Sequence, residues 1–252
     1  MEFNKIYNED CLNTMARMQD GAIDLTVTSP PYFNARSYSQ YETVSKYIDV
    51  MDSIFNEIYR VLKPNRMCVV NISPVLVPRA KRSESSKRIP LPYYFVPMIE
   101  NIGFDFLEDI IWVKPEGAAA NRNGGFYKHR KPLSYKPNII TEYILVFKKP
   151  SKYLLDKDLK NTSLVEDGYE RSNVWKMQPE TTSKHSAPFP EALPDKIIKY
   201  YSYEGDIVYD PFIGSGTTAK MALLNNRKYI GSELSAEYVE IAKERLKQTK
   251  LF

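Results

Sequence analysis

The sequence predicts an open α/β fold, in which a mostly parallel sheet carries helices on both faces. Short apolar runs that are typical of buried strands, such as 23–27 and 67–72, alternate with helical patterns such as 47–62. A Ser-Pro-Pro-Tyr turn at 29–32 follows the first of these runs directly. A glycine-containing turn at 210–218 lies between another strand-like run and a helical pattern. Because open sheets bind ligands at the carboxyl ends of their strands, both turns are candidate site elements.

Size and composition narrow the class of protein. The 252 residues are 43% hydrophobic, which suffices for one large α/β domain with an appended element. A net charge of +4 favours a local surface for an anionic partner. Two cysteines, Cys11 and Cys68, form no disulfide framework and fit a reducing cytosol. There is no signal-peptide pattern and no apolar run of about 18 residues, so we expect a soluble cytoplasmic protein. No Cys/His cluster has metal-ligand spacing, so we expect no metal.

The amino-terminal elements lead to the first turn. A short strand at 5–7 precedes Asp10, which is suited to cap a helix that carries Leu12 and Met15 on one face. The strand-like run 23–27 then ends at the first turn. The two prolines cannot continue a strand ladder, so they fix Ser29 at the strand end with the ring of Tyr32 three residues on.

The central part of the chain combines strands with basic segments. A helix at 93–101 ends at Gly103, and strand-like runs at 109–113 and 142–147 follow it, the second within an edge strand expected at about 142–148. One basic loop could contact DNA phosphates, although a solvated surface loop is the alternative. A second loop mixes glycine, aromatic and basic residues, which suits reading of guanine edges in a groove. The basic candidates are Arg79, Lys81 and Arg82 in the first loop and Lys128, Arg130 and Lys131 in the second.

Three ligand classes use a glycine-containing turn like 210–218. A P-loop is excluded because Gly216 is followed by Thr217 and not by lysine. The dinucleotide fingerprint G-x-G-x-x-A is satisfied, and Glu233 lies about where its acidic residue is expected. However, Asp210 at the strand end would repel a pyrophosphate. A cationic ligand fits better, and S-adenosylmethionine (SAM) has a sulfonium, an amino group and ribose hydroxyls that would suit Glu233.

The carboxyl-terminal part supplies further candidates. Phe189 and Pro190 precede a helix on which Leu193 and Ile197 share one face, and core packing is the alternative role for Phe189 and Leu193. Ser235 is suited to cap the last helix, where basic residues that include Arg245 are expected to face outward.

Together, the Ser-Pro-Pro-Tyr turn and the later glycine turn resemble the β group of DNA amino-methyltransferases, most closely the N4-cytosine enzymes. The resemblance extends from about Tyr7 to Arg245 and is weakest between 115 and 182. It implies a Rossmann-like SAM-dependent methyltransferase sheet with an antiparallel edge strand and a permuted motif order. It also implies a catalytic half at 1–114, a target-recognition region at 115–182 interrupted by the edge strand, and a SAM-binding half at 183–252.

The resemblance assigns roles to individual residues. It implies that Ser29, Pro30, Pro31 and Tyr32 are catalytic. It implies cofactor contacts from both halves of the chain, namely Asp10, Cys11, Phe189, Pro190, Leu193, Asp210, Pro211, Phe212, Gly214, Ser215, Gly216, Thr217, Thr218, Glu233 and Leu234.

The expected activity is methyl transfer from SAM to the exocyclic N4 amine of a flipped cytosine in double-stranded DNA. The resemblance leaves N6 of adenine open as the acceptor. Three competing functions also stay open, namely an NAD(P)-linked oxidoreductase, methylation of RNA or protein, and a DNA-binding module without activity. A restriction-modification or epigenetic marking system, with a cognate endonuclease as partner, and a homodimer are further expectations.

Overall fold

The computed structural model describes residues 1–34, 40–77, 81, 86–118, 124–152, 164–165, 168–180 and 189–249. Its central sheet has eight strands in the order β1-β10-β9-β2-β3-β7-β6-β8. β7 runs antiparallel to both of its neighbours, and the other pairs in this sheet are parallel. The predicted mostly parallel α/β sheet with an antiparallel element is therefore confirmed. The strands are β1 (Lys5–Tyr7), β2 (Ile23–Thr28), β3 (Leu62–Ile72), β6 (Asp105–Val113), β7 (Thr141–Lys148), β8 (Val174–Lys176), β9 (Ile207–Asp210) and β10 (Lys228–Ser232).

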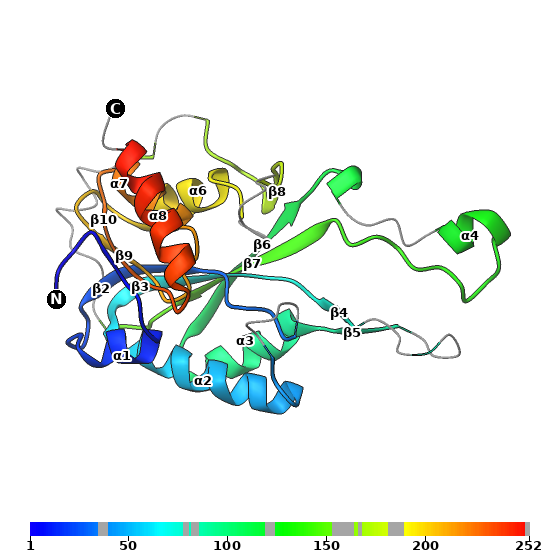
Figure 1. Ribbon diagram of the computed structural model, residues 1–252, viewed down its shortest axis with the longest axis horizontal. Helices are drawn as coiled ribbons and strands as arrows, with labels where there is room; N and C mark the ends of the chain where they lie inside the picture. Colours follow the sequence, from blue (N-terminus) through cyan, green and yellow to red (C-terminus); the bar gives the residue numbers. More distant parts are fainter. Residues whose placement is uncertain are drawn as a thin grey trace.

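Helices cover both faces of the sheet (Figure 1). One face carries α1 (Cys11–Ala16), α2 (Val44–Val61) and α3 (Leu91–Ile102), and the other carries α6 (Ala192–Tyr201), α7 (Thr217–Leu224) and α8 (Ala236–Thr249). The sequence pattern explains this packing, because the apolar stripe of α2 is fully buried at Tyr47, Phe55 and Ile58. Gly103 ends α3 as predicted, with a φ of 117° that favours glycine.

The position predicted for the edge strand is wrong in one respect. β7, which covers the predicted strand at about 142–148, is paired on both sides, with β3 and with β6. The short strand β8 lies beyond β6 and is the outermost strand on this side. Three residues are too short a run to be recognised as a strand from sequence. Trp175 fixes β8 in place, because its ring is buried and contacts Tyr200 of α6.

Two segments project from the side of the sheet at which β2, β3 and β9 have their carboxyl ends. A hairpin of β4 (Val75–Val77) and β5 (Lys87–Ile89) follows β3, and a longer arm between β6 and β7 carries η1 (Glu116–Ala118) and α4 (Gly124–His129). Figure 1 shows both segments extending away from the body of the protein in the same direction. Arg88 of the hairpin donates a hydrogen bond to the Pro137 carbonyl of the arm (3.1 Å), so the two projections are joined.

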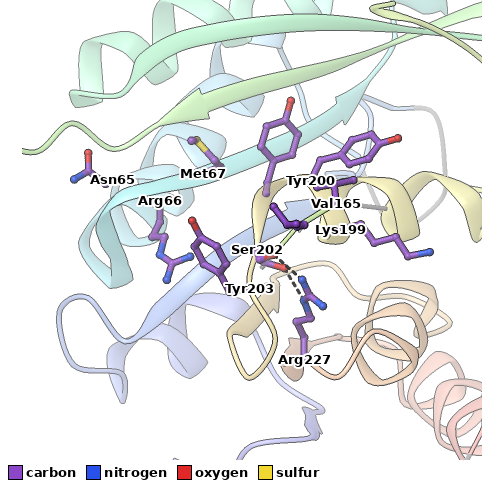
Figure 2. A pocket seen from close by; sticks show the side chains of 11 residues that line it. Asn65, Arg66, Met67, Val165, Lys199, Tyr200, Ser202, Tyr203 and Arg227 are labelled. Atoms are coloured by element: carbon purple, nitrogen blue, oxygen red, sulfur yellow. Dashed lines mark hydrogen bonds between the residues drawn. The ribbon is translucent and has the colours of Figure 1, made fainter. Parts of the chain in front are cut away.

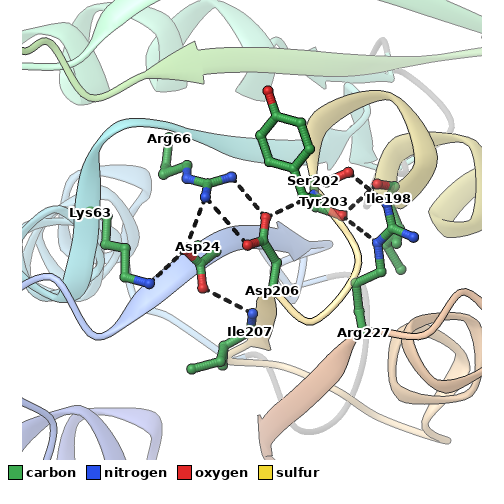
Figure 3. A network of polar contacts seen from close by, with 9 residues as sticks. All are labelled: Asp24, Lys63, Arg66, Ile198, Ser202, Tyr203, Asp206, Ile207 and Arg227. Atoms are coloured by element: carbon green, nitrogen blue, oxygen red, sulfur yellow. Dashed lines mark hydrogen bonds and ion pairs between the residues drawn. The ribbon is translucent and has the colours of Figure 1, made fainter. Parts of the chain in front are cut away.

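A charged cluster with buried carboxylates joins the strands at the opposite side of the sheet, where the parallel strands begin (Figure 3). Arg66 of β3 pairs with Asp206 before β9 (2.7 Å) and with Asp24 of β2 (3.3 Å). Lys63 also pairs with Asp24 (2.7 Å), whose second oxygen accepts a hydrogen bond from the Ile207 amide (3.0 Å). These contacts fix the relative positions of β2, β3 and β9, and therefore of the turns at their other ends.

Candidate active site

The Ser-Pro-Pro-Tyr turn and the glycine turn lie side by side because their strands, β2 and β9, are neighbours. A carboxylate joins them: Asp210 accepts hydrogen bonds from the Thr28 hydroxyl (2.8 Å), the Thr218 hydroxyl (2.7 Å) and the Phe212 amide (3.0 Å). Asp210 is only 1% exposed, and this burial raises its pKa to about 6. The two predicted motifs therefore form one site at the carboxyl ends of the parallel strands.

The glycine turn packs closely against α8. Gly216 has a φ of 81°, and a Cβ atom there would lie 2.8 Å from the Cβ of Ala242. The Gly214 amide donates a hydrogen bond to the Glu233 carboxylate (3.0 Å). The turn thus needs glycine for both its conformation and its packing, and its backbone lies beside Glu233.

The ends of β1 and β10 complete the cofactor side of the site. Asn8 donates hydrogen bonds to the carbonyls of Glu233 (2.8 Å) and Leu234 (3.0 Å), which places the segment after β1 beside the segment after β10. Asp10 caps α1 as predicted by accepting from the Leu12 amide (2.8 Å). Burial raises the pKa of the Glu233 carboxyl, which also accepts from the Ser235 amide (2.8 Å).

Not every predicted cofactor residue has its side chain free for a ligand. The hydroxyls of Ser215 and Thr217 accept hydrogen bonds from Arg245 (3.2 and 2.7 Å), and Arg245 also pairs with Glu180. The prediction that Arg245 faces outward is therefore wrong: its side chain is only 17% exposed because it holds the glycine turn from α8. Leu193 is fully buried in the core.

The remaining predicted residues line the same region. Cys11 is buried beside the hydroxyl of Tyr209, which lies 3.5 Å from the Cys11 carbonyl, and burial raises the pKa of the Cys11 thiol to about 12. Pro190 and Pro211 are buried, whereas Phe189 and Phe212 are partly exposed. Leu234 is 73% exposed next to Glu233.

A polar network that sequence reasoning missed surrounds Ser29 and Tyr32. The Tyr32 hydroxyl donates to Glu142 of β7 (3.0 Å). Asn71 of β3 donates through Nδ2 to Glu142 (2.8 Å), and the two N–H groups of Nδ2 also face the Tyr32 hydroxyl (3.3 Å) and Ser29 Oγ (3.5 Å). Lys114, just after β6, forms an ion pair with Glu142. A polar residue inside the apolar run 67–72 was the available signal for Asn71.

The cofactor side of the site matches the chemistry of SAM. Its carboxylates, at Asp10, Asp210 and Glu233, favour a ligand that carries positive charge and hydroxyl donors. Phe212 and Leu234 offer apolar surface beside these carboxylates. These residues would hold the amino, sulfonium and ribose groups of SAM, which supplies an electrophilic methyl group when bound.

The predicted DNA-contact residues that the structure describes lie on the two projections. Lys128 is on α4, Arg130 and Lys131 follow it, and all three are exposed. Lys81 is an exposed residue beyond β4, whereas Arg79 and Arg82 lie outside the described residues. The described basic candidates are therefore on the side of the sheet where Ser29 lies.

A cavity of about 260 Å³ lies elsewhere (Figure 2). It is lined by residues near the side of the sheet where the parallel strands begin, including Arg66, Tyr200, Tyr203 and Arg227. The Arg227 side chain donates hydrogen bonds to the Ser202 carbonyl (2.6 Å) and the Ser202 hydroxyl (3.0 Å). These bonds help to form one wall of the cavity. This cavity is separate from the site formed by the two motifs.

Two structural findings concern other classes of site. Over the described ranges, none of the helices combines the length and apolar character that crossing a membrane requires. The same ranges contain no group of three or more His, Cys, Asp or Glu side chains arranged to hold a metal ion.

Comparison with known proteins agrees with the geometry of the site. The profile of the DNA methylase family, which covers N6 and N4 methylases, matches residues 23–244. The orphan methyltransferase M.BamHII of Bacillus amyloliquefaciens is 35% identical, with 90% of each chain covered. The Type II beta methyltransferase M.BslI of Bacillus sp. (strain NEB-606) is 33% identical over 96% of this chain, which spans only 27% of that longer protein.

Among solved structures, the putative DNA modification methylase TTHA0409 of Thermus thermophilus, determined in complex with S-adenosyl-L-methionine, superimposes with a TM-score of 0.80. It is 27% identical, and the match covers 97% of this chain and 93% of TTHA0409. The similarity therefore includes both motifs and the sheet that joins them. The chain belongs to the DNA methylase family, within the permuted β group of SAM-dependent DNA methyltransferases.

Proposed function

We propose that this SAM-dependent DNA methyltransferase methylates the exocyclic N4 amine of a cytosine flipped out of double-stranded DNA. The observation that carries the proposal is the pair of hydrogen bonds from Thr28 and Thr218 to Asp210. They hold Ser29 beside the turn that would bind the cofactor, so an amine bound at Ser29 can face the methyl group.

The residues of the turn act on a weak nucleophile. An exocyclic amine shares its lone pair with the ring, and hydrogen bonds to Ser29 Oγ and the Pro30 carbonyl would reduce this conjugation. Holding the two reactants in this orientation can supply about 7–11 kcal/mol of the barrier. Flipping the base costs a few kcal/mol. Stacking on Tyr32 would recover about 1–3 kcal/mol of that cost.

The choice of cytosine depends on Ser29. In this family, enzymes that methylate adenine usually have Asp or Asn at this position, and Ser-Pro-Pro-Tyr is commoner among the N4-cytosine enzymes. Ser is the smaller residue and leaves a differently shaped pocket that suits a pyrimidine. Adenine N6 is the second candidate, since an adenine amine can use the same acceptors.

Product identity tests the proposal. DNA is methylated with SAM that carries a labelled methyl group, digested to nucleosides and analysed by mass spectrometry. We expect the label in N4-methylcytosine. Label in N6-methyladenine would replace the base and keep the reaction class, whereas label in 5-methylcytosine would refute amine transfer altogether. In a parallel titration, we expect SAM to bind and NAD not to bind.

The basic projections should have separable roles on DNA. Lys81→Gln should weaken binding to all duplexes and reduce the salt slope by about 1, because it would lose a phosphate contact. Arg130→Gln with Lys131→Gln should lower discrimination against mismatched sites by about 1–3 kcal/mol, because base contacts carry specificity. The control is Lys243→Gln on the exposed side of α8. Binding is measured against salt on matched and mismatched duplexes, and equal behaviour of the two sets would contradict this division.

We keep as predictions the division into a catalytic half, a target-recognition region and a SAM-binding half, together with the roles of the individual residues. A cognate endonuclease and a homodimer are also predictions. The restriction-modification context has support from relatives that include Type II methyltransferases.

A further inference from the structure

A continuous chain of side chains leads from the Ser-Pro-Pro-Tyr turn to a carboxylate on a neighbouring strand. The Ser29 and Tyr32 hydroxyls interact and both lie near Asn71 Nδ2 (3.5 and 3.3 Å), and the Tyr32 hydroxyl donates to Glu142 Oε2 (3.0 Å). Glu142 is 110 residues from Tyr32 in sequence and reaches the turn because β7 lies beside β3 in the sheet. The Glu142 side chain is only 12% exposed, and Lys114 pairs with its other oxygen.

We propose that Glu142 accepts the proton that the target amine loses, through Ser29 and Tyr32. This inference rests on the proposed amine methylation and adds to it a route for the proton and a positioning role for Asn71 and Lys114.

The transfer conserves atoms and electrons. The amine lone pair forms the new N–C bond, the C–S bond of SAM breaks, and sulfur keeps that electron pair and becomes a neutral thioether. As the N–C bond forms, positive charge develops on the nitrogen, which loses one proton to Ser29 Oγ in the same step. The Ser29 hydroxyl proton passes to the Tyr32 oxygen, and the Tyr32 proton passes to Glu142 Oε2. Ser29 and Tyr32 end as they began, and Glu142 ends protonated.

The groups around this path favour proton transfer toward Glu142. Burial and the negative charge of Glu142 raise the pKa of Tyr32 well above its usual range, so the phenol stays protonated and can pass a proton on. The other carboxylate close to the turn, Asp210, already accepts three hydrogen bonds from the protein. Asn71 cannot accept a proton at neutral pH.

Asn71 indicates that the bound substrate supplies a hydrogen-bond donor to this site. The residue is 3% exposed, and Nδ2 faces Ser29, Tyr32 and Glu142. Its Oδ1 atom is buried without a hydrogen-bond partner among the described residues. A buried acceptor without a partner costs free energy unless a ligand supplies the donor. An N–H of the bound base would supply it, while Nδ2 keeps the three members of the path in place.

The first test removes the acceptor and keeps the shape. In Glu142→Gln, single-turnover methyl transfer should slow about 10²-fold, the range typical of general-base catalysis. Affinities for SAM and for DNA should change less than about twofold, because neither needs the proton to leave. Glu57→Gln is the matched control, since Glu57 is also ion-paired, with Arg60, but lies on α2 away from the site.

The second test separates proton transfer from a structural role. Asn71→Asp places a carboxylate where Nδ2 now lies, 3.3 Å from the Tyr32 hydroxyl and 3.5 Å from Ser29 Oγ. Added to Glu142→Gln, it should restore the single-turnover rate at least about tenfold, and it should restore the solvent deuterium isotope effect that Glu142→Gln loses.

The outcomes are distinct. A normal rate in Glu142→Gln, or a slow rate that Asn71→Asp leaves unchanged, would overturn the proton route. The product assay on the parent protein decides the proposed function separately. Label in N6-methyladenine would overturn the choice of cytosine but leave the route to be tested in the same way, because an adenine amine loses one proton too.

Discussion

Ser29→Ala should slow single-turnover methyl transfer about 10³-fold and leave the affinity for SAM within about twofold. The substitution removes the hydroxyl that accepts from the target amine, and loss of one preorganised polar contact to a reacting group typically costs about 10²–10³-fold. It also removes the first member of the proton path to Glu142, so we expect a loss of rate at the upper end of this range. SAM binding should persist because the cofactor side is built from β1, β9 and β10.

Rapid-quench measurement with labelled SAM and calorimetric titration of SAM check the two parts. Ser53→Ala is the control, because the Ser53 hydroxyl is hydrogen-bonded only within α2 among the contacts of the described residues, to the Asp49 carbonyl (3.1 Å). A Ser29→Ala rate within tenfold of the parent would show that the amine is held by other groups.

Asp210→Ala should lower both the free energy of unfolding, by about 2 kcal/mol, and the affinity for SAM, by about 100-fold. The sequence suggests only a ligand-binding role for Asp210, but the structure gives its oxygens three protein donors. Without the carboxylate, the buried hydroxyls of Thr28 and Thr218 lose their acceptor, and the glycine turn loses its link to β2. Chemical denaturation and calorimetry measure the two effects. Lower stability with parental SAM affinity would make Asp210 purely structural.

The pH dependence gives an independent check on the same carboxyl. Its pKa is raised to about 6 in the folded protein from an ordinary value of 3.8. Between these values the folded protein keeps a proton that the unfolded chain has released, so the contribution of Asp210 to stability falls as pH rises from about 4 to about 6. Asp210→Asn lacks this titration, and its free energy of unfolding should change less with pH across that window. Identical pH profiles would contradict the raised pKa.

Local signals in the sequence were sufficient for much of the fold. The Asp10 cap, the end of α3 at Gly103 and the strand before each motif are each determined by a few adjacent residues, and the structure confirms them. The two turns were also predictable as candidate site elements, because glycine and proline restrict the backbone wherever they occur. Their adjacency followed from the family resemblance and not from the residues alone.

What the sequence could not provide were contacts between distant segments. Glu142 meets Tyr32 across 110 residues, and Arg245 meets Thr217 from a helix whose outer face is otherwise charged. A basic residue on such a helix normally faces solvent, so periodicity predicted the wrong environment for Arg245. The short strand β8 was missed because a single buried Trp175 supplies its main anchor.

The arm that carries α4 begins and ends in one strand pair. Val113 and Thr141 are register partners at the end of β6 and the start of β7, and the Lys114 amide donates to the Ile140 carbonyl (2.7 Å) directly beyond them. The chain therefore leaves the sheet and returns to it at nearly the same point, closed by a backbone hydrogen bond that does not depend on side-chain identity. Such an attachment lets the inserted segment change in length and composition while the chemistry beside it stays intact. If the arm reads the target sequence as proposed above, a new target sequence can be acquired there while the sheet and the two turns are kept.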